Sequence, residues 1–422
     1  MDYKPISDYG VIGDMHSAAL AGADGSIDWL CFPRFDCPSV FAALLDAKSG
    51  GRFRISPADP QARSSQRYLP ESNVLATEFR AGSGAVTLID FMPVGEKLTD
   101  AAHELARMVR CTSGEVDMRL VFEPRLDYGR ARTRVTVDGA LAAARLGGDT
   151  LSLISSVPLE GGADAATASF RLRQGESASF VLRWGGEKAR RQPLEDVSAE
   201  LERTQAFWRF VSSDYRYDGR WQEAVKRSMM ALHLLIYAPT GAVCAAATTS
   251  LPERMGGGRN WDYRFCWLRD AAFTMDIFHR MGHTAYTRPF LDWMTRFTDC
   301  EMGHEVHSLF EIGRETDPHT MSEYTLPHFE GYRGSGPTTA SGSSAPNPGT
   351  SPTPRSWRGS QRTAACGSPM LCSVRWTSTA GCASGRPFAP TSRLTAGTRS
   401  AAPSSSTTAA LTSTPACSSC PW

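Results

Sequence analysis

The composition of the chain changes abruptly at Glu330, and this change limits where a fold can form. Up to Glu330 acidic and basic residues are mixed, whereas residues 331–422 contain no Asp, Glu or Lys and only eight Arg. Ser, Thr, Ala, Pro and Gly dominate this later stretch. Its apolar residues follow neither a helical nor a strand period, so it has no apolar face to bury. The first 330 residues must therefore supply the folded core.

Residues 336–422 admit three interpretations. They could be a Ser/Thr/Pro-rich disordered tail, a small cysteine-rich domain, or a GC-rich gene read in the wrong frame. We favour the third, because a solvated tail rarely holds cysteines and tryptophans and because Pro387–Trp422 can be back-translated so that a neighbouring frame has helix-like spacing. We therefore expect a disordered, low-complexity tail after a truncation or frame shift near residue 335. The residues that argue against an ordinary tail are Cys366, Cys372, Cys382, Cys417, Cys420, Trp357, Trp376 and Trp422.

The charges of the whole chain are balanced. Its 422 residues hold 45 Lys plus Arg against 44 Asp plus Glu, for a net charge of +1. This balance gives no electrostatic basis for binding nucleic acid or an anionic membrane surface. No apolar run approaches the roughly 20 residues that a membrane-spanning helix needs. We expect neither a nucleic-acid partner nor a membrane partner, and the sequence leaves the oligomeric state open.

The cysteines before residue 335 do not have the spacing of metal ligands. Met1–Gly10 lacks the basic and apolar regions of a signal peptide, so we expect a cytoplasmic protein with free, mostly buried thiols. His304 and His307 also match no metal motif, and we interpret them as solvated loop residues. No metal or other cofactor is expected. The cysteines are Cys31, Cys37, Cys111, Cys244, Cys266 and Cys300.

Residues 1–190 have the pattern of an antiparallel β-sandwich. Short segments alternate between apolar and polar residues, and Gly, Asp or Pro interrupts them every 8 to 12 positions. This period-2 pattern with frequent turns is typical of β-sandwich domains. The clearest segments are 86–91, 118–122, 133–138 and 178–183.

From about Leu194 the pattern changes to helices. Between Gly219 and Tyr237 an apolar stripe recurs at spacings of three and four residues, through Trp221, Val225, Met229, Leu232 and Leu235. Further helices are predicted at 263–281, closed by Gly282, and at about 285–297. Helices linked by long, motif-bearing loops favour an all-α toroid over a sheet with crossover helices.

Residues 248–270 hold the densest group of chemically useful side chains. Gly256–Gly258 would let a loop backbone approach a ligand closely, while Asp and Arg supply charge-assisted hydrogen bonds. Aromatic faces beside such groups suit a sugar, which has apolar C–H faces and hydroxyls. The same residues could instead be core tryptophans and a local ion pair, and nothing in their spacing requires Asp262 and Asp270 to be an acid–base pair. The side chains concerned are Trp261, Asp262, Tyr263, Arg264, Trp267, Arg269 and Asp270.

Three segments of this region resemble the signature of bacterial glycoside hydrolase family 15, which holds glucoamylases, glucodextranases and trehalases. They are Ser250–Glu253 (SLPE), Arg259–Arg264 (RNWDYR) and Trp267–Asp270 (WLRD). Other segments resemble the trehalase-like N-terminal domain, and the resemblance covers residues 1 to about 335. These are Tyr9–Asp14 (YGVIGD), Asp24–Leu30 (DGSIDWL), Pro33–Asp36 (PRFD), Ile89–Pro93 (IDFMP), Glu123–Tyr128 (EPRLDY) and Tyr237–Gly241 (YAPTG).

The resemblance implies a β-sandwich at 1–190 followed at 191–335 by the first part of an (α/α)6 barrel, here an incomplete toroid. It implies inverting hydrolysis of an α-glucosidic bond, in trehalose or another α-glucoside. By motif, Tyr263 and Trp267 would pack against the sugar, and Arg269 and Asp270 would hydrogen-bond its hydroxyls. Trp261 and Asp262 would shape the same pocket.

The resemblance also implies that catalysis is missing from this chain. Inversion needs a carboxylic acid and a carboxylate base about 6.5–9.5 Å apart. In the family both are glutamates of later segments, Gly-Ile-Trp-Glu and Gly-Glu-x-x-Gly-Asn-Phe, and neither segment occurs here. No catalytic residue is therefore assigned, and we expect the chain to be inactive. Two alternatives are a non-catalytic carbohydrate-binding protein and a β-sandwich scaffold with an incidental helical part.

Overall fold

The computed structural model describes only part of the chain. The described residues lie within the larger of two compact units, Met1–Ser351. The predictions for 344–422 and for His304, His307 and Cys300 fall outside them, so these stay predictions. The described residues are 3–95, 101–130, 132–185, 196–249, 251, 261–298, 309–313, 321–326, 328–329 and 338–343.

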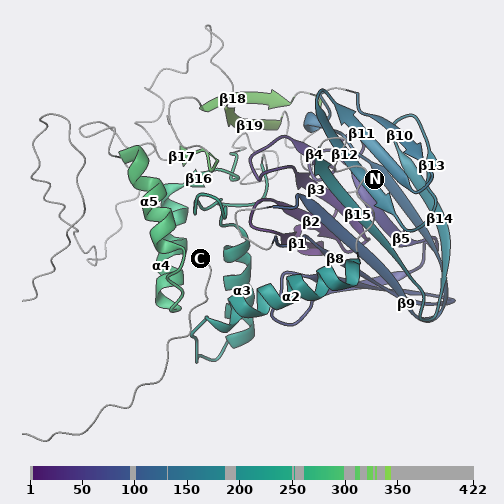
Figure 1. Cartoon of the computed structure of the whole chain (residues 1–422), viewed down its shortest axis with the longest axis horizontal. Helices are drawn as coiled ribbons and strands as arrows, with labels where there is room; N and C mark the ends of the chain where they lie inside the picture. Colours follow the sequence, from purple (N-terminus) through teal and green to yellow (C-terminus); the bar gives the residue numbers. More distant parts are fainter. Residues whose placement is uncertain are drawn as a thin grey trace, which may run out of the picture. The chain divides into compact units, whose positions relative to one another are not determined.

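The N-terminal part of the described structure is a large antiparallel β region (Figure 1). Two short 3-10 helices, Ile6–Asp8 and Asp127–Gly129, accompany its strands. The strands are β1 Tyr9–Gly13, β2 Ala18–Gly22, β3 Ser26–Cys31, β4 Ser39–Phe41, β5 Arg52–Pro57, β6 Arg63–Tyr68, β7 Leu75–Ala81, β8 Gly84–Phe91, β9 Glu104–Glu123, β10 Arg134–Asp138, β11 Leu141–Leu146, β12 Asp149–Ser155, β13 Glu160–Gly161, β14 Ala166–Arg173 and β15 Ser177–Gly185.

The long strand β9 joins the two layers of this region. Its first half pairs with β8 and β15, and its second half pairs with β5 and β14. Gly114, where the halves meet, has a φ of +65°, and a Cβ there would lie 2.2 Å from the Ser83 carbonyl oxygen. Only glycine fits such a position without strain, so Gly114 allows β9 to serve both layers.

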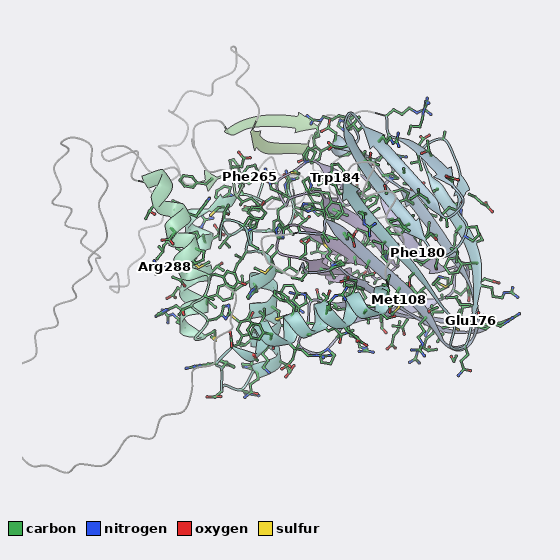
Figure 2. The ribbon with its side chains drawn as sticks, in the orientation of Figure 1. Met108, Glu176, Phe180, Trp184, Phe265 and Arg288 are labelled. Carbon is green, nitrogen blue, oxygen red and sulfur yellow. The ribbon has the colours of Figure 1, made fainter. Side chains whose placement is uncertain are left out.

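The two layers share one apolar core. Inward-facing residues alternate with polar ones along the strands, as in Phe53 and Ile55 of β5 and Leu120 and Phe122 of β9, all fully buried. Phe180 of β15, labelled in Figure 2, belongs to the same core. The prediction of a sandwich-like antiparallel N-terminal domain is confirmed, and each of the four predicted segments lies in or overlaps a strand.

Four α helices follow in the described residues: α2 Val197–Ser213, α3 Gln222–Leu234, α4 Leu268–Arg280 and α5 Thr287–Thr298. The three predicted helices therefore exist, with shorter bounds. The predicted stripe on α3 is wrong in part, because Trp221 precedes the helix and is 61% exposed. The buried positions of α3 are Met229, Met230, His233 and Leu234.

The four described helices are too few to show the closed ring of helices that an (α/α)6 barrel forms. The toroid therefore stays a prediction. The helices pack on a second core that also takes Met15, Ala18 and Phe35 from the β region. No described helix has the length and apolar character to cross a membrane. Two small sheets complete the described elements: β16 Cys266–Trp267 with β17 Leu309–Phe310, and β18 Met321–Leu326 with β19 Thr338–Ser343.

β19 corrects one prediction. Residues 338–343 belong to the predicted disordered tail, yet they form a strand in antiparallel register with β18, from Leu326 opposite Thr338 to Met321 opposite Ser343. The sequence pattern missed this strand because TTASGS has no apolar alternation. Strand pairing uses backbone N–H and C=O groups, which every one of these residues has.

Candidate functional site

The predicted site residues lie together around β16 and the first turn of α4. Tyr263 and Trp267 are half-buried, with ring centroids 5.5 Å apart and planes inclined by 35°. Trp261 is 37% exposed, and its ring meets Trp267 edge-on at 6.4 Å. The Trp267 indole N–H donates to the Asp262 carbonyl oxygen at 3.1 Å, which fixes the ring. The structure thus brings the three predicted aromatic residues into one group.

Asp262 is buried beneath this group. Its Oδ2 accepts from Arg264 Nη2 at 2.7 Å, and its Oδ1 accepts from Arg264 Nε at 3.0 Å and from the Arg264 backbone N–H at 3.0 Å. Both side chains are completely shielded from solvent. A carboxylate held by a bidentate guanidinium in this way stabilises the loop, so Asp262 holds the segment beneath the aromatic group in place.

Arg264 anchors the segment to the β region. Its guanidinium donates to the carbonyl oxygens of Cys37 at 2.6 Å and Phe35 at 3.2 Å, and to the Tyr128 hydroxyl at 2.6 Å. Burial disfavours the charged guanidinium, but the Asp262 carboxylate outweighs burial and raises the pKa of Arg264 well above its ordinary value. Arg264 therefore stays charged. Sequence reasoning placed Arg264 in the motif but not among the site residues.

Neighbouring backbone contacts hold the same segment from the other side. The Ala246 N–H donates to the Tyr263 carbonyl oxygen at 2.7 Å, and the Ala245 N–H donates to that of Phe265 at 3.2 Å. The Trp29 indole of β3 donates to the Ala247 carbonyl oxygen at 2.7 Å. Phe265, labelled in Figure 2, is buried. Residues 263–264 form a turn, Phe265 a bend and Cys266–Trp267 the strand β16, so α4 begins at Leu268 and not at the predicted Tyr263.

Arg269 and Asp270 form an accessible ion pair at the start of α4. Arg269 Nη2 lies 3.1 Å from Asp270 Oδ2, with 67% and 36% of the two side chains exposed. The Arg269 guanidinium carbon lies 5.9 Å from the Trp267 ring centroid. Asp270 sits in the first helical turn, where the helix dipole favours a negative charge. Both side chains are therefore accessible to a ligand that lies against the aromatic group.

One further pair beside the site was not anticipated from the sequence. Because β16 pairs with β17, Glu311 lies just beyond the partner of Cys266. Arg34 donates to Glu311 at 3.4 Å and to Asp36 at 2.9 Å. Arg34 belongs to the PRFD segment, which carried the resemblance without an assigned role. The PRFD segment was therefore a signal for this pair. The contact between Arg34 and Glu311 spans 277 residues, however, and only the fold reveals it.

The described part of this region offers binding groups more clearly than catalytic ones. Asp262 has no exposed surface, and Asp270 and Glu311 each face an arginine. No set of three or more His, Cys, Asp or Glu among the described residues could hold a metal ion. Aromatic faces next to an exposed Arg–Asp pair suit a polyhydroxylated ligand, which needs apolar contact, donors and acceptors together.

Family comparisons agree with this arrangement. The family model described as trehalase-like, N-terminal matches residues 1–208, and the model of glycosyl hydrolases family 15 matches residues 219–343. The chain belongs to glycosyl hydrolase family 15. The family 15 match ends at residue 343, the end of β19, and so extends past the predicted limit near residue 335.

Several curated relatives of this family 15 chain are trehalases. The chain is 32% identical over 361 residues to a trehalase of Mycolicibacterium smegmatis, covering 79% of this chain and 53% of the relative. It is 33% identical over 323 residues to a trehalase of Thermoplasma acidophilum, covering 75% and 54%. It is 32% identical over 346 residues to trehalase 1 of Sulfolobus acidocaldarius, covering 81% and 56%. The chain spans about half the length of these relatives.

Proposed function

We propose that this chain carries the sugar-binding segment of an enzyme that hydrolyses the α-glucosidic bond of trehalose or a gluco-oligosaccharide. The observation that supports this most is the aromatic group of Trp261, Tyr263 and Trp267 beside the exposed Arg269–Asp270 pair. The trehalase names of the relatives favour trehalose as the first substrate to test. In this proposal the domains have the bounds predicted from the sequence, with a β-sandwich at 1–190 and a partial hydrolase domain at 191–335.

The residues divide into two roles in this proposal. Tyr263 and Trp267 pack against a C–H face of a glucosyl ring, while Arg269 donates to its hydroxyls and Asp270 accepts from them. Trp261 forms the rim of the pocket. Asp262 does not touch the sugar and acts through Arg264, whose contacts to the β region hold the loop in place. Asp262 is thus a positioning residue.

We further propose that the chain does not itself hydrolyse the bond. An inverting mechanism needs a general acid and a general base on opposite sides of the bond, with room for a water molecule. Residues 331–422 hold no carboxylate to serve as either. Asp262, the most deeply placed carboxylate of the described site, is neutralised by Arg264.

Calorimetric titration with trehalose and maltotriose, together with a glucose-release assay, tests both proposals. We expect saturable binding, at least tenfold weaker in Trp267→Ala and Asp270→Asn, and no glucose release. Asp276→Asn is the matched control, because Asp276 forms an exposed ion pair with Arg280 further along α4. Absence of binding contradicts the sugar site, and glucose release contradicts the proposed inactivity.

The wrong-frame interpretation of the tail has its own test. The gene would be resequenced from the codons of Arg314 through those of Trp422 and about a kilobase beyond. We expect either a frame shift with a deletion in the gene itself or a sequencing error that produces the same reading frame. If an intact frame resumes with both glutamate segments, the gene encodes an active α-glycosidase. If the written frame is confirmed, function rests on binding alone.

A further inference from the structure

The outer face of three neighbouring strands carries a set of charged residues that the proposed function does not use. Strands β3, β5 and β9 are adjacent in the sheet. Ser26 lies opposite Arg54, which in turn lies opposite Val121, and Arg52 lies opposite Glu123. Side chains alternate between the two faces of a strand. Since the intervening residues are in the core, this row points outward.

This face is hollowed into two adjoining cavities. The larger has a volume of about 480 Å³, and the smaller has a volume of about 190 Å³. Asp24, Arg52 and Arg54 line both cavities, so the two form one elongated groove. The segment 57–62 lines the larger cavity and Tyr3 the smaller. The larger cavity alone is within the roughly 300–1,000 Å³ typical of ligand sites.

The charged side chains along the groove balance one another. Four are basic and four are acidic, so the groove has no excess charge that would favour an anion or a cation. It offers guanidinium and ammonium donors beside carboxylate acceptors. A hydroxyl group both donates and accepts, so a neutral polyhydroxylated chain can use both kinds of group. The basic residues are Lys4, Arg52, Arg54 and Arg119, and the acidic residues are Asp24, Asp28, Asp59 and Glu123.

Asp28 places a further carboxylate at the smaller cavity of the groove. Asp28 is 2% exposed and lines the smaller cavity. Its Oδ2 accepts from the Tyr9 hydroxyl at 2.8 Å and from Lys4, whereas its Oδ1 accepts a hydrogen bond from no described residue.

Two groups of the larger cavity also remain available. Arg119 and Glu123, both on β9, form no ion pair with another described residue, although each is charged and at least partly exposed. On the same strand, Glu115 and Asp117 are paired with Arg171 of β14. Along β9 the described ion pairs thus stop at Asp117, before Arg119 and Glu123.

We propose that this groove on β3, β5 and β9 is a second saccharide site, which binds a neutral oligosaccharide without cleaving it. Its strands lie in the β region, whereas the sugar site described above lies at β16 and the start of α4 (Figure 1). The site would hold a chain of several sugar units along its length. It does not depend on the function proposed for residues 261–270.

Binding to the full chain tests the proposal, with maltohexaose and cellohexaose as neutral probes and a heparin hexasaccharide as the anionic probe. We expect one neutral probe to bind saturably by ligand-observed NMR. Glu123→Gln and Arg119→Ala should each weaken binding at least tenfold. Glu115→Gln and Arg171→Ala are matched controls on β9 and β14 and should change it less than twofold. Far-UV circular dichroism verifies the fold of each variant.

The outcomes separate this groove from the first site. Trp267→Ala should abolish trehalose binding and leave groove binding intact, so either site can fail while the other holds. The groove proposal is overturned if neither neutral hexasaccharide binds, if binding survives in both groove variants, or if only the heparin probe binds.

Discussion

The β region and the helical region differ in how much apolar surface they leave exposed to solvent. Among the described residues, the β region exposes one large apolar side chain, Ile6, whereas residues 196–298 expose six. On α4 and α5, Phe273 is 68% exposed and Leu291 is 52% exposed. A large exposed apolar patch marks a surface that needs a partner. The described helices therefore leave more apolar surface uncovered than the β region does.

Apart from α2, the dependence also runs in one direction. Val197 and Leu201 of α2 pack on the β region, in a buried cluster that includes Phe91 and Val181. The core under the helices includes Met15, Ala18 and Phe35 of the β region, whereas the core between the two sheet layers uses no residue of the helices. Arg264 adds hydrogen bonds from the helical segment to the β region. We infer that the β region, together with α2, can persist while α3, α4 and α5 open, but not the reverse.

The largest expected effect comes from breaking the link between the regions. Replacing Arg264 with Met leaves Asp262 as a buried, unpaired carboxylate, which costs about 3–5 kcal/mol. In urea, tryptophan fluorescence should then report loss of the helical region before circular dichroism reports loss of the sheets. Arg269→Met removes an exposed pair worth at most about 1 kcal/mol and serves as control. A single transition at the wild-type midpoint in Arg264→Met contradicts the dependence.

Two phenylalanines of α4 sharpen the contrast between buried and exposed apolar surface. Phe278 is fully buried and Phe273 is 68% exposed. Phe278→Ala should lower the free energy of unfolding by about 3–5 kcal/mol. Phe273→Ser should change it little and should reduce concentration-dependent aggregation, measured by light scattering. Equal losses in the two variants would mean that the outer face of α4 is covered.

Buried histidines should make the helical region sensitive to acid. Burial lowers the pKa of His233, with a smaller effect from His283, and burial also lowers the pKa of His283, although Asp214 at 3.7 Å opposes this. The unfolded state binds protons below about pH 6.5 while the folded rings stay neutral, so stability falls as pH decreases from there.

The slope should approach about 1.4 kcal/mol per pH unit for each histidine. Thermal unfolding between pH 7.5 and 5.5 measures it, and His283→Gln should flatten it. A wild-type melting temperature that is constant over this range counts against the prediction.

The smallest effect concerns the start of the helical region. The Asp196 carboxylate accepts from the backbone N–H groups of Ser198 and Ala199 at the N-terminus of α2. Because Val197 and Leu201 of α2 pack on the β region, Asp196→Ala should cost about 1 kcal/mol and shift the circular dichroism transition of the sheets modestly. Asp196→Asn keeps the acceptor and should restore most of the loss. A shift of the fluorescence transition alone would place α2 with the other helices.

The sequence predicted the sheets better than the helical packing, for a physical reason. A strand with one buried face has period 2, which segments such as Ala178–Arg183 display directly. The prediction that Trp221 belongs to the apolar stripe of α3 was wrong, because the spacing of apolar residues alone does not tell which of them face the core. β19 was missed because its pairing depends on backbone groups.

The candidate site was predictable as a group but not in its internal roles. Trp261, Tyr263 and Trp267 are close in sequence, and the structure places their rings together. Arg264 reaches Tyr128 and Cys37, which lie more than a hundred residues away. The groove on β3, β5 and β9 likewise depends on register across strands. Contacts of this kind follow from topology, which local patterns do not encode.

The position of β9 also has a consequence for synthesis of the chain. β9 pairs with β5 and β8, which precede it, and with β14 and β15, which follow it. At ordinary elongation rates, residues 124–185 take on the order of 3–12 s to make. During that interval the nascent strand has an unpaired edge that another chain can occupy. A ribosome-associated chaperone would therefore act most usefully here, before any helix has been translated.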